Sequence, residues 1–134
     1  MRQSNNIQDF LAGKRFAVVG ASSRREKYGN KVLRAYLQNG LEAVPINPAG
    51  GDIEGLKSYP DLASVPGTID GVSIITPSAV TEKVVDQAIE LGIKHIWMQP
   101  GAESVAAIEK AAAAGANVIA GGPCLLVSLR FHDH

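Results

Sequence analysis

The sequence predicts an α/β fold: a Rossmann-like doubly wound sheet of about five parallel strands, in the order 3-2-1-4-5, with helices on both faces. Two observations lead to this prediction. Short apolar runs alternate with longer segments of helical periodicity along the chain, which is typical of strand–helix–strand units. The apolar runs, among them VSII and HIWM, are almost continuously hydrophobic, as strands are when helices cover both faces of a parallel sheet. Right-handed crossovers between such strands then produce a doubly wound sheet.

Turn and capping residues indicate where each element begins and ends. In chain order we expect a leading helix at 4–12, within residues 1–13; a strand at 15–20; a helix at 29–40; a strand at 42–47; a loop at 48–55; a turn or short helix at 59–66; strands at 71–76, 94–98 and 116–121 that alternate with helices at 78–91 and 104–115; and a C-terminal tail at 122–134 with room for one helical turn. Gly40 and Gly115 are placed to end helices, and Ser78 and Ser104 to cap the starts of two others. Pro45 favours an edge-like or irregular position for the second strand, because proline lacks the N–H that a strand ladder needs.

Length and composition indicate one globular domain spanning residues 1–134. Apolar residues make up 46% and charged residues 19%, and the formal net charge is zero, so the chain as a whole does not attract nucleic acid or an anionic membrane. No apolar run is long enough to span a membrane, and the N-terminal residues lack the apolar stretch of a signal peptide. The single cysteine, Cys124, excludes an intrachain disulfide. We therefore expect a cytoplasmic protein with a small-molecule ligand and no membrane or nucleic-acid partner, while a protein partner or a homo-oligomer stays open.

A ligand should bind beyond the carboxyl ends of the strands, at the point where the strand order reverses. Each segment that follows a strand there is rich in small or polar residues. These segments are 20–29, 47–51, 76–79, 99–103 and 121–124.

The loop after the first strand carries the strongest signal. Gly20 makes the turn from strand to helix, and the N–H groups at the start of a helix attract phosphate. Hydroxyl and cationic side chains follow within this loop: Ser22, Ser23, Arg24, Arg25 and Lys27. We therefore expect an anion to bind here, with a solvated basic face as the simpler alternative. The G-x-x-x-x-G-K-[ST] pattern of nucleoside triphosphate hydrolases does not occur in the sequence.

The end of the second strand bears on the identity of that anion. Dinucleotide-binding domains usually have an Asp or Glu at this place, which accepts hydrogen bonds from ribose hydroxyls. Here the residues are Ile46, Asn47 and Pro48, so NAD is disfavoured. Arg24 or Arg25 could hold the additional phosphate of NADP, which keeps that cofactor as an alternative.

Four stretches of the sequence together resemble a known family. They are VVGAS with YGNKV, VPINPAGGDIEGLKSYPDLASVP, GVSIITPSAVTEKVVDQAIELGIKHIWMQPGA, and AAGANVIAGGPC. In this order, from Lys14 to Cys124, they look like the small single-domain CoA-binding proteins, which are similar to the N-terminal domain of the succinyl-CoA synthetase alpha subunit. The resemblance implies a Rossmann-like fold that binds CoA along the strand ends.

The resemblance also implies a set of CoA-binding residues, all in the segments that follow the strands. The set consists of Gly20, Ala21 and Ser22 at the pyrophosphate; Ser23, Arg24, Arg25, Lys27 and Tyr28 in the same loop, with a basic residue at a phosphate; Asn47 and Pro48 beside the adenosine part; Thr76, Pro77 and Ser78 along the pantetheine; Gln99, Pro100 and Gly101 deeper in the groove; and Cys124 near the end of the last strand.

No catalytic group stands out in this set. Cys124 is the one nucleophile of note, no histidine is obviously placed to activate it, and no Cys/His spacing suits a metal. His95 is interpreted as a structural residue, and His132 and His134 as solvent-exposed groups of the tail. The chain departs from the family where Gly-Gly-Pro precedes Cys124, since single-domain members often carry a charged or polar residue there. The second synthetase domain, with its phosphorylated histidine, does not fit in 134 residues.

The sequence therefore predicts non-catalytic binding of CoA or an acyl-CoA, as a carrier, a sensor or a regulatory partner. Two alternatives stay open. One is an NADP-binding module or reductase fragment, and the other is a protein-interaction module with a vestigial cleft.

Overall fold

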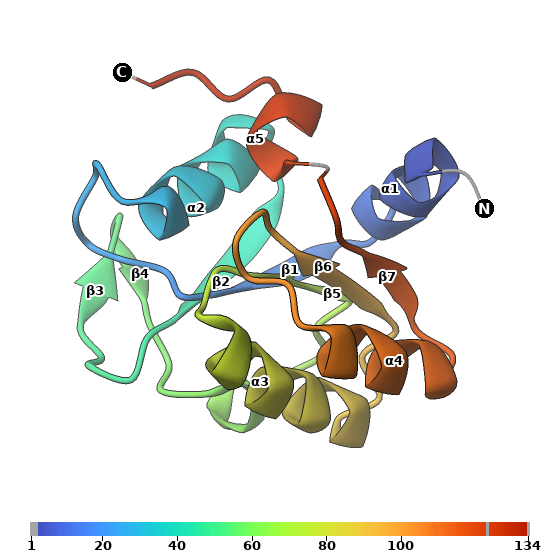
Figure 1. The fold of residues 1–134 in the computed structure, drawn as a ribbon. Helices are drawn as coiled ribbons and strands as arrows, with labels where there is room; N and C mark the ends of the chain where they lie inside the picture. Colours follow the sequence, from blue (N-terminus) through green and yellow to red (C-terminus); the bar gives the residue numbers. More distant parts are fainter. Residues whose placement is uncertain (1–2, 123, 134) are drawn as a thin grey trace.

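A parallel sheet lies between two layers of helices (Figure 1). The computed structural model describes residues 3–122 and 124–133, so His134 and the proline of the Gly-Gly-Pro-Cys stretch lie outside the described residues. The five strands of the sheet are β1 (Arg15–Val19), β2 (Glu42–Ile46), β5 (Gly71–Ile74), β6 (His95–Met98) and β7 (Asn117–Ile119). One layer holds α1 (Gln3–Leu11), α2 (Tyr28–Gln38) and α5 (Leu125–Ser128), and the other holds α3 (Ser78–Glu90) and α4 (Val105–Ala113). The predicted α/β fold is thus confirmed, including the leading helix and the helical turn in the C-terminal tail.

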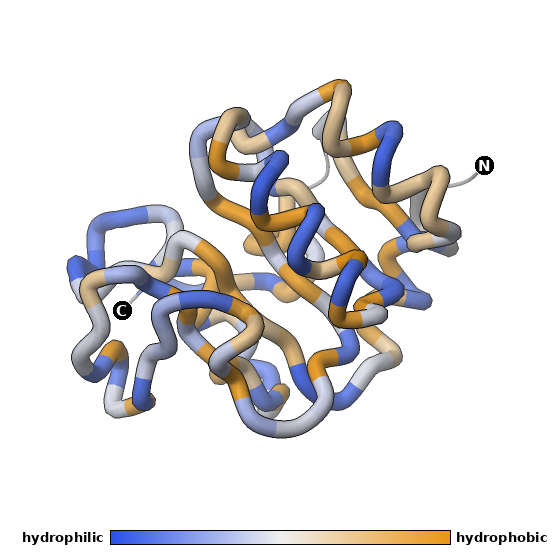
Figure 2. Tube along the Cα trace, turned by 90° about the horizontal axis from the view of Figure 1, so that it is seen from below, coloured by the Kyte–Doolittle hydropathy of each residue, from blue (hydrophilic) through white to orange (hydrophobic). Residues whose placement is uncertain are grey.

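Both faces of the sheet are buried, as the continuous apolar runs predict. Along β1, Phe16 and Val18 face the layer of α1, α2 and α5, whereas Ala17 and Val19 face α3 and α4. Phe10 of α1 stacks on Phe16 with 5.3 Å between the ring centroids. In Figure 2, hydrophobic colours follow the strands through the middle of the molecule. Burying each large apolar side chain stabilises the folded state by about 1.5–3 kcal/mol. The two cores therefore fix the strands in place, and the strand ends are not needed for the core.

The strand order differs from the predicted 3-2-1-4-5. The sheet runs β2-β1-β5-β6-β7, which is 2-1-3-4-5 when the parallel strands are numbered along the chain. Pro45 of β2 explains the difference. Its carbonyl lies on the outer edge of the strand and accepts a hydrogen bond from the N–H of Tyr59 (3.0 Å). On that same edge, where a neighbouring strand would need an N–H donor, proline has none. A further full strand could not form a continuous ladder there, and the third parallel strand pairs with β1 instead. The edge position that Pro45 indicates for the second strand is confirmed.

A small hairpin occupies part of the segment that was expected to be a loop. β3 (Asp52–Ile53) and β4 (Leu56–Lys57) pair in antiparallel orientation. Glu54 and Gly55, between them, both have left-handed backbones, with φ values of 51° and 79°. Two-residue turns with left-handed backbones are typical of hairpins, and their usual sequences are Asn-Gly and Asp-Gly. The Glu-Gly pair here does not match these sequences, so the turn could not be recognised from the sequence. Ile53 is 2% exposed and anchors the hairpin in the core beneath α2.

One of the two predicted serine caps is confirmed. Ser104 is the N-cap of α4, and its hydroxyl accepts a hydrogen bond from the N–H of Ala107 (3.2 Å). The prediction for Ser78 is wrong, because Pro77 is the N-cap of α3 and Ser78 is its exposed first residue. Pro77 already has the extended ψ of 150° that an N-cap requires, and its carbonyl accepts the first helical hydrogen bonds. The expected short helix before β5 is the 3-10 turn η1 (Leu62–Ser64).

His95 and His132 make hydrogen bonds within the protein. His95 Nδ1 lies 3.1 Å from the side-chain amide of Asn117, at the edge of the Phe10 ring. The backbone of His132 exchanges two hydrogen bonds with the side chain of Gln38. Within the described ranges, three or more His, Cys, Asp or Glu residues nowhere gather in a way that could hold a metal ion. None of the described helices combines the length and the hydropathy needed to cross a membrane.

We predict that Gly29→Ala destabilises the protein by about 3 kcal/mol. A Cβ at this position, in the first turn of α2, would lie 1.9 Å from the Gly20 carbonyl oxygen, so the helix would have to move away from the loop. Differential scanning calorimetry should show a Tm lower by roughly 10 °C. The matched control is Gly40→Ala, where φ is 70° but no atom lies within 4 Å of the added Cβ. The control should lose only about 1 kcal/mol, and equal losses would contradict the packing explanation.

Candidate functional site

The strand order reverses between β1 and β5. The chain leaves β1 for β2 on one side and later returns to β5 on the other, so the loops after β1 and β5 lie side by side. The N–H of Ile75 donates to the carbonyl of Val19 over 2.8 Å. Gly20 has a φ of 97°, and a Cβ there would lie 2.0 Å from the carbonyl oxygen of Ile75. Only glycine fits at Gly20, because two backbones are in direct contact at this switch point.

The N-terminus of α2 lies against the same loop through the contact between Gly29 and Gly20. Lys27 is the N-cap and makes no side-chain capping bond, and the first turn contains no acidic residue. The positive end of the helix is therefore not neutralised by a side chain of its own first turn. Such a helix end favours a bound anion.

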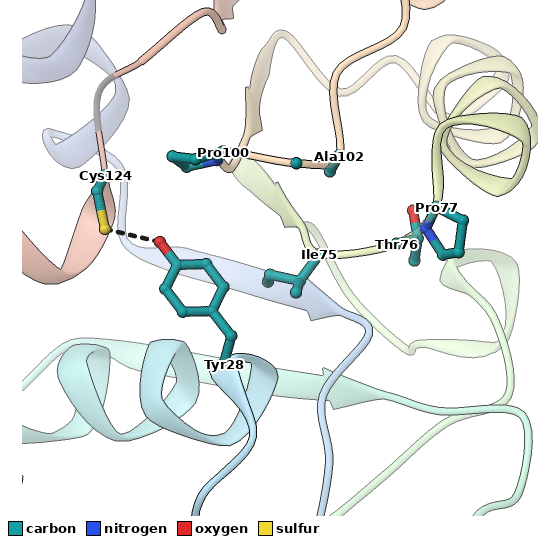
Figure 3. A pocket seen from close by; sticks show the side chains of 8 residues that line it. Tyr28, Ile75, Thr76, Pro77, Pro100, Ala102 and Cys124 are labelled. Carbon is teal, nitrogen blue, oxygen red and sulfur yellow. Dashed lines mark hydrogen bonds between the residues drawn. The ribbon is translucent and has the colours of Figure 1, made fainter.

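An open cavity of about 630 Å³, which we call the groove, lies at the carboxyl ends of β5 and β6 (Figure 3). Its walls come from the start of α2, the loops after β5 and β6, and the residue before α5. The lining residues are Tyr28, Ile75, Thr76, Pro77, Pro100, Gly101, Ala102 and Cys124. Figure 3 shows Tyr28 and Cys124 pointing toward each other at one end, and Thr76 and Pro77 at the other. Most of this surface is apolar, and its polar side-chain groups are concentrated at the two ends.

A chain of hydrogen bonds closes the Tyr28 end of the groove. The Tyr28 hydroxyl donates to Gln99 Oε1 (3.1 Å), and the N–H of Leu125 donates to the same oxygen (2.9 Å). Because that amide oxygen only accepts and Tyr28 has a single proton, the phenol oxygen is left to accept from the Cys124 thiol, whose Sγ lies 2.6 Å away. Burial, together with Cys124, raises the pKa of Tyr28, so the phenol stays protonated at neutral pH. The Tyr28 hydroxyl and the Cys124 Sγ together form the polar end of the groove.

Gln99 positions this end of the groove from below. Its side chain is completely buried, and no hydrogen-bond partner for Nε2 is found among the described residues. Exchanging the amide oxygen and nitrogen would not remedy this, because the N–H of Leu125 also needs an acceptor. A buried N–H without a partner costs about 1–3 kcal/mol. Gln99 therefore orients Tyr28 and the start of α5 at some cost in stability.

A second cavity of about 220 Å³, which we call the side pocket, lies on the α3 side of the switch point. Its residues are Val19, Gly20, Ile46, Pro48, Pro60, Asp61, Leu62, Thr76, Val80, Val84 and Gln87. Its polar side chains already have partners: Asp61 accepts from the N–H and hydroxyl of Ser64, and Gln87 accepts from the N–H of Leu62. Thr76 lines both cavities, so the groove and the side pocket meet at one residue.

The two arginines of the loop before α2 have acidic partners. Arg24 pairs with Glu26 over 2.7 Å, and both side chains are largely exposed. Arg25 pairs with Glu54 of the hairpin over 2.7 Å. Lys27 is exposed. The loop is thus less cationic in the folded protein than its sequence indicates.

Buried polar groups of α2 hold the loop in shape. Asn30 donates to the carbonyl of Ser22 (2.8 Å), and its oxygen accepts from Arg34 Nε (2.6 Å). Arg34, which is 5% exposed, also donates to the carbonyl of Arg25 (2.8 Å) and to Asp133 in the C-terminal tail (3.1 Å). Because these groups lie on the first two turns of α2, the loop and the helix form one rigid unit.

The predicted binding residues gather at the switch point, although not all face a cavity. The groove contains Tyr28, Thr76, Pro77, Pro100, Gly101 and Cys124, and the side pocket contains Gly20, Pro48 and again Thr76. Ala21 and Gln99 are buried, Ser22 is half-buried, and Ser23, Arg24, Arg25, Lys27 and Ser78 are exposed. Asn47 connects two of the loops, because its amide donates to the carbonyl of Ala21 over 2.8 Å.

Several wall residues were not predicted. Ile75 and Ala102 line the groove, and Val80 and Val84 line the side pocket. Apolar wall residues look like core residues in a sequence, so the sequence holds no signal that would identify them. Glu54 was missed because the hairpin that carries it was expected to be a loop.

Comparisons with known proteins agree with this geometry. The family model described as a CoA binding domain matches residues 14–130. The uncharacterized protein YneT of Bacillus subtilis is 30% identical over 106 residues, which cover 79% of this chain and 78% of that protein. A conserved hypothetical protein of Pyrococcus furiosus with a solved structure is 37% identical and has a TM-score of 0.81, with 87% of this chain and 99% of that chain covered.

A larger enzyme shares part of the same sequence. The ADP-forming acetate–CoA ligase II of Archaeoglobus fulgidus is 31% identical over 91 residues. This match covers 66% of the present chain and 14% of the ligase. Since the family model extends over most of the chain, from the start of β1 to the end of α5, the chain belongs to the CoA-binding domain family.

Proposed function

We propose that this protein binds CoA or an acyl-CoA across the switch point and catalyses no reaction on it. The observation that carries the proposal is the pair of largely apolar cavities that meet at Thr76, with the positive end of α2 beside them. CoA has the same division into parts. It consists of a flat adenosine end, a group of phosphates, and a long pantetheine arm that ends in a thiol.

The groove suits the pantetheine arm. Its walls are mainly apolar side chains and the backbone of Pro100 and Gly101, which an extended chain with few charges can line. At its closed end the Tyr28 hydroxyl and the Cys124 thiol are the polar side-chain groups. In this placement the thiol of CoA, or the thioester of an acyl-CoA, lies toward Cys124.

The side pocket suits the adenine ring. Ile46, Pro48 and Leu62 supply apolar surface, and one side-chain oxygen each of Asp61 and Gln87 already accepts hydrogen bonds within the protein. The loop at Gly20 lies between the two cavities, and the adjacent end of α2 favours phosphate. Lys27 adds positive charge at the exposed side of this loop.

The groups that line the cavities support binding more than chemistry. General acid–base or nucleophilic catalysis needs a nucleophile with a base in reach. The hydroxyl beside Cys124 belongs to a tyrosine whose raised pKa keeps it protonated at neutral pH, so it is not available as a base. Asp61 is the carboxylate of the side pocket, and it is committed to Ser64. We infer a carrier, a sensor or a regulatory partner.

The remaining features of the proposal concern the setting of the protein. We propose that residues 1–134 form a single domain that acts in the cytoplasm, with a homo-oligomer or a protein partner as open states. Ligase activity is not part of the proposal, because the chain spans only 14% of the Archaeoglobus fulgidus ligase that it matches. NADP ranks below CoA, because Arg25 and Arg24, the candidates for its additional phosphate, pair with Glu54 and Glu26.

Thermal unfolding tests whether the ligand is CoA. CoA at a hundred times its Kd should raise the free energy of unfolding by about 2.7 kcal/mol and the Tm by roughly 8 °C. NAD and NADP at the same concentration should leave the Tm unchanged. Native mass spectrometry of the purified protein would identify any ligand that co-purifies. A shift with NADP and none with CoA would replace the proposal by the NADP alternative, and no shift with either would favour an interaction module.

A carboxylate in the loop at residues 20–27, which we call the phosphate loop for its proposed role, should abolish CoA binding. Ser22→Glu would place a negative charge next to the ligand phosphates, where like charges cost several kcal/mol, which corresponds to at least a hundredfold loss of affinity. Isothermal titration calorimetry measures the loss, and circular dichroism checks the fold. Ala112→Glu, on the exposed side of α4, adds the same charge far from the loop and should bind normally. Normal binding by a folded Ser22→Glu protein would remove the loop from the site.

A further prediction concerns Cys124, which is partly exposed at the closed end of the groove. CoA disulfide should react with it, because attack by the Cys124 thiolate forms a mixed disulfide and releases one CoA thiolate. Intact-protein mass spectrometry should show one CoA adduct that is lost on adding dithiothreitol and absent from Cys124→Ser. If no adduct forms at concentrations where CoA binds, the pantetheine arm does not reach Cys124.

A further inference from the structure

The tip of the β3–β4 hairpin contacts the loop that leads into α2, and Figure 1 shows the two lying close together. Glu54 Oε1 lies 2.7 Å from a guanidinium nitrogen of Arg25. Its other oxygen accepts a hydrogen bond from the side-chain amide of Asn30 over 3.0 Å. The Glu54 side chain is 18% exposed, against 53% for Arg25. A carboxylate from a distant hairpin is thus inserted between the phosphate loop and the first turn of α2.

The hairpin turn does not account for a glutamate at this position. Glu54 has a φ of 51°, a left-handed conformation that non-glycine residues rarely adopt and that Asn and Asp tolerate best. Asn or Asp before Gly55 would be the usual choice for such a turn. A side chain longer than that of Asn or Asp is needed to reach Arg25. The contacts with Arg25 and Asn30 are therefore what this residue contributes.

The same contacts keep the carboxylate charged. The hydrogen bond from Asn30, with the positive charges of Arg25 and of Arg34 behind it, holds the pKa of Glu54 below its ordinary value against the opposing effect of burial. Glu54 is consequently an anion throughout the neutral range. It occupies a position beside a cation and a buried amide donor, which is the kind of environment that also binds a phosphate group.

We propose that Glu54 is an internal anion that competes with the phosphate groups of the ligand for Arg25 and so lowers the affinity of the site. The inference rests on the proposed function in one respect, namely that ligand phosphate binds at this loop. A phosphate that reaches Arg25 must displace the carboxylate or lie beside it, and each outcome weakens binding. Glu54 thereby sets the ligand concentration at which the site fills.

Neutralising Glu54 tests the inference directly. E54Q should bind CoA about tenfold more tightly than the wild type in isothermal titration calorimetry, a difference of about 1.4 kcal/mol. In an R25Q background the same substitution should change the affinity less than twofold, because the contested cation is gone. The matched control is E26Q, which removes an exposed carboxylate from Arg24 in the same loop and should alter the affinity less than E54Q does. Inorganic pyrophosphate, titrated into the same proteins, reports on the loop independently of the two cavities.

The outcomes separate this inference from the proposed function. If the wild type binds CoA and E54Q gains nothing, Glu54 does not compete and the inference fails alone. If E54Q binds more weakly, Glu54 positions Arg25 for the ligand, which also overturns the inference. If CoA does not bind but E54Q gains affinity for pyrophosphate only when Arg25 is present, the proposed ligand is wrong and the inference stands. If CoA does not bind and E54Q gains no affinity for pyrophosphate, both the proposed function and the inference fail. Should E54Q not fold, E54N must show the same gain, because Asn tolerates the left-handed backbone and its shorter amide does not reach Arg25.

Discussion

Direct contact between backbones at the switch point is the constraint on which the rest of the structure depends. Gly20 brings the loop after β1 against the carbonyl of Ile75, and Gly29 brings the start of α2 against Gly20. Side chains are absent from these contacts, so three segments meet at distances that no other residue type allows. The position of Tyr28, one residue before Gly29, follows from this contact, and with it the width of the groove. The two apolar cores make the contact durable, because they fix the strands from both faces of the sheet.

Features that depend on neighbours in the sequence were predicted well. The parallel sheet, the leading helix, the Ser104 cap and the closeness of the candidate site residues at the strand ends all follow from local patterns. The strand order was wrong even though Pro45 already pointed to an edge position, because an edge position for the second strand excludes the order 3-2-1-4-5. Ser78 failed as a cap because proline at the preceding position is itself suited to that role. Wall residues such as Ile75 could not be told from core residues, since both are apolar and follow a buried strand.

Charge shows most clearly what a sequence cannot indicate. The stretch around the phosphate loop looks strongly basic, yet Arg24 and Arg25 both have acidic partners in the folded protein. The partner of Arg25 is 29 residues away in the chain, on a hairpin whose turn sequence is unusual. Arg34 belongs to the same basic stretch, but it is buried and holds the loop from below. The positive potential expected at this loop therefore comes less from net charge than from the end of α2.

The position of Thr76 between the groove and the side pocket has a consequence for how affinity arises. A molecule with two arms joined by a short linker can fill both cavities at once. After one arm binds, the other is held next to its own cavity at an effective concentration in the millimolar range or above. The contributions of the two weakly binding arms to the overall binding constant then multiply, as in a chelate. Fragments that carry only one arm gain none of this advantage, so an abundant small metabolite that matches a single cavity is a poor competitor for the whole ligand.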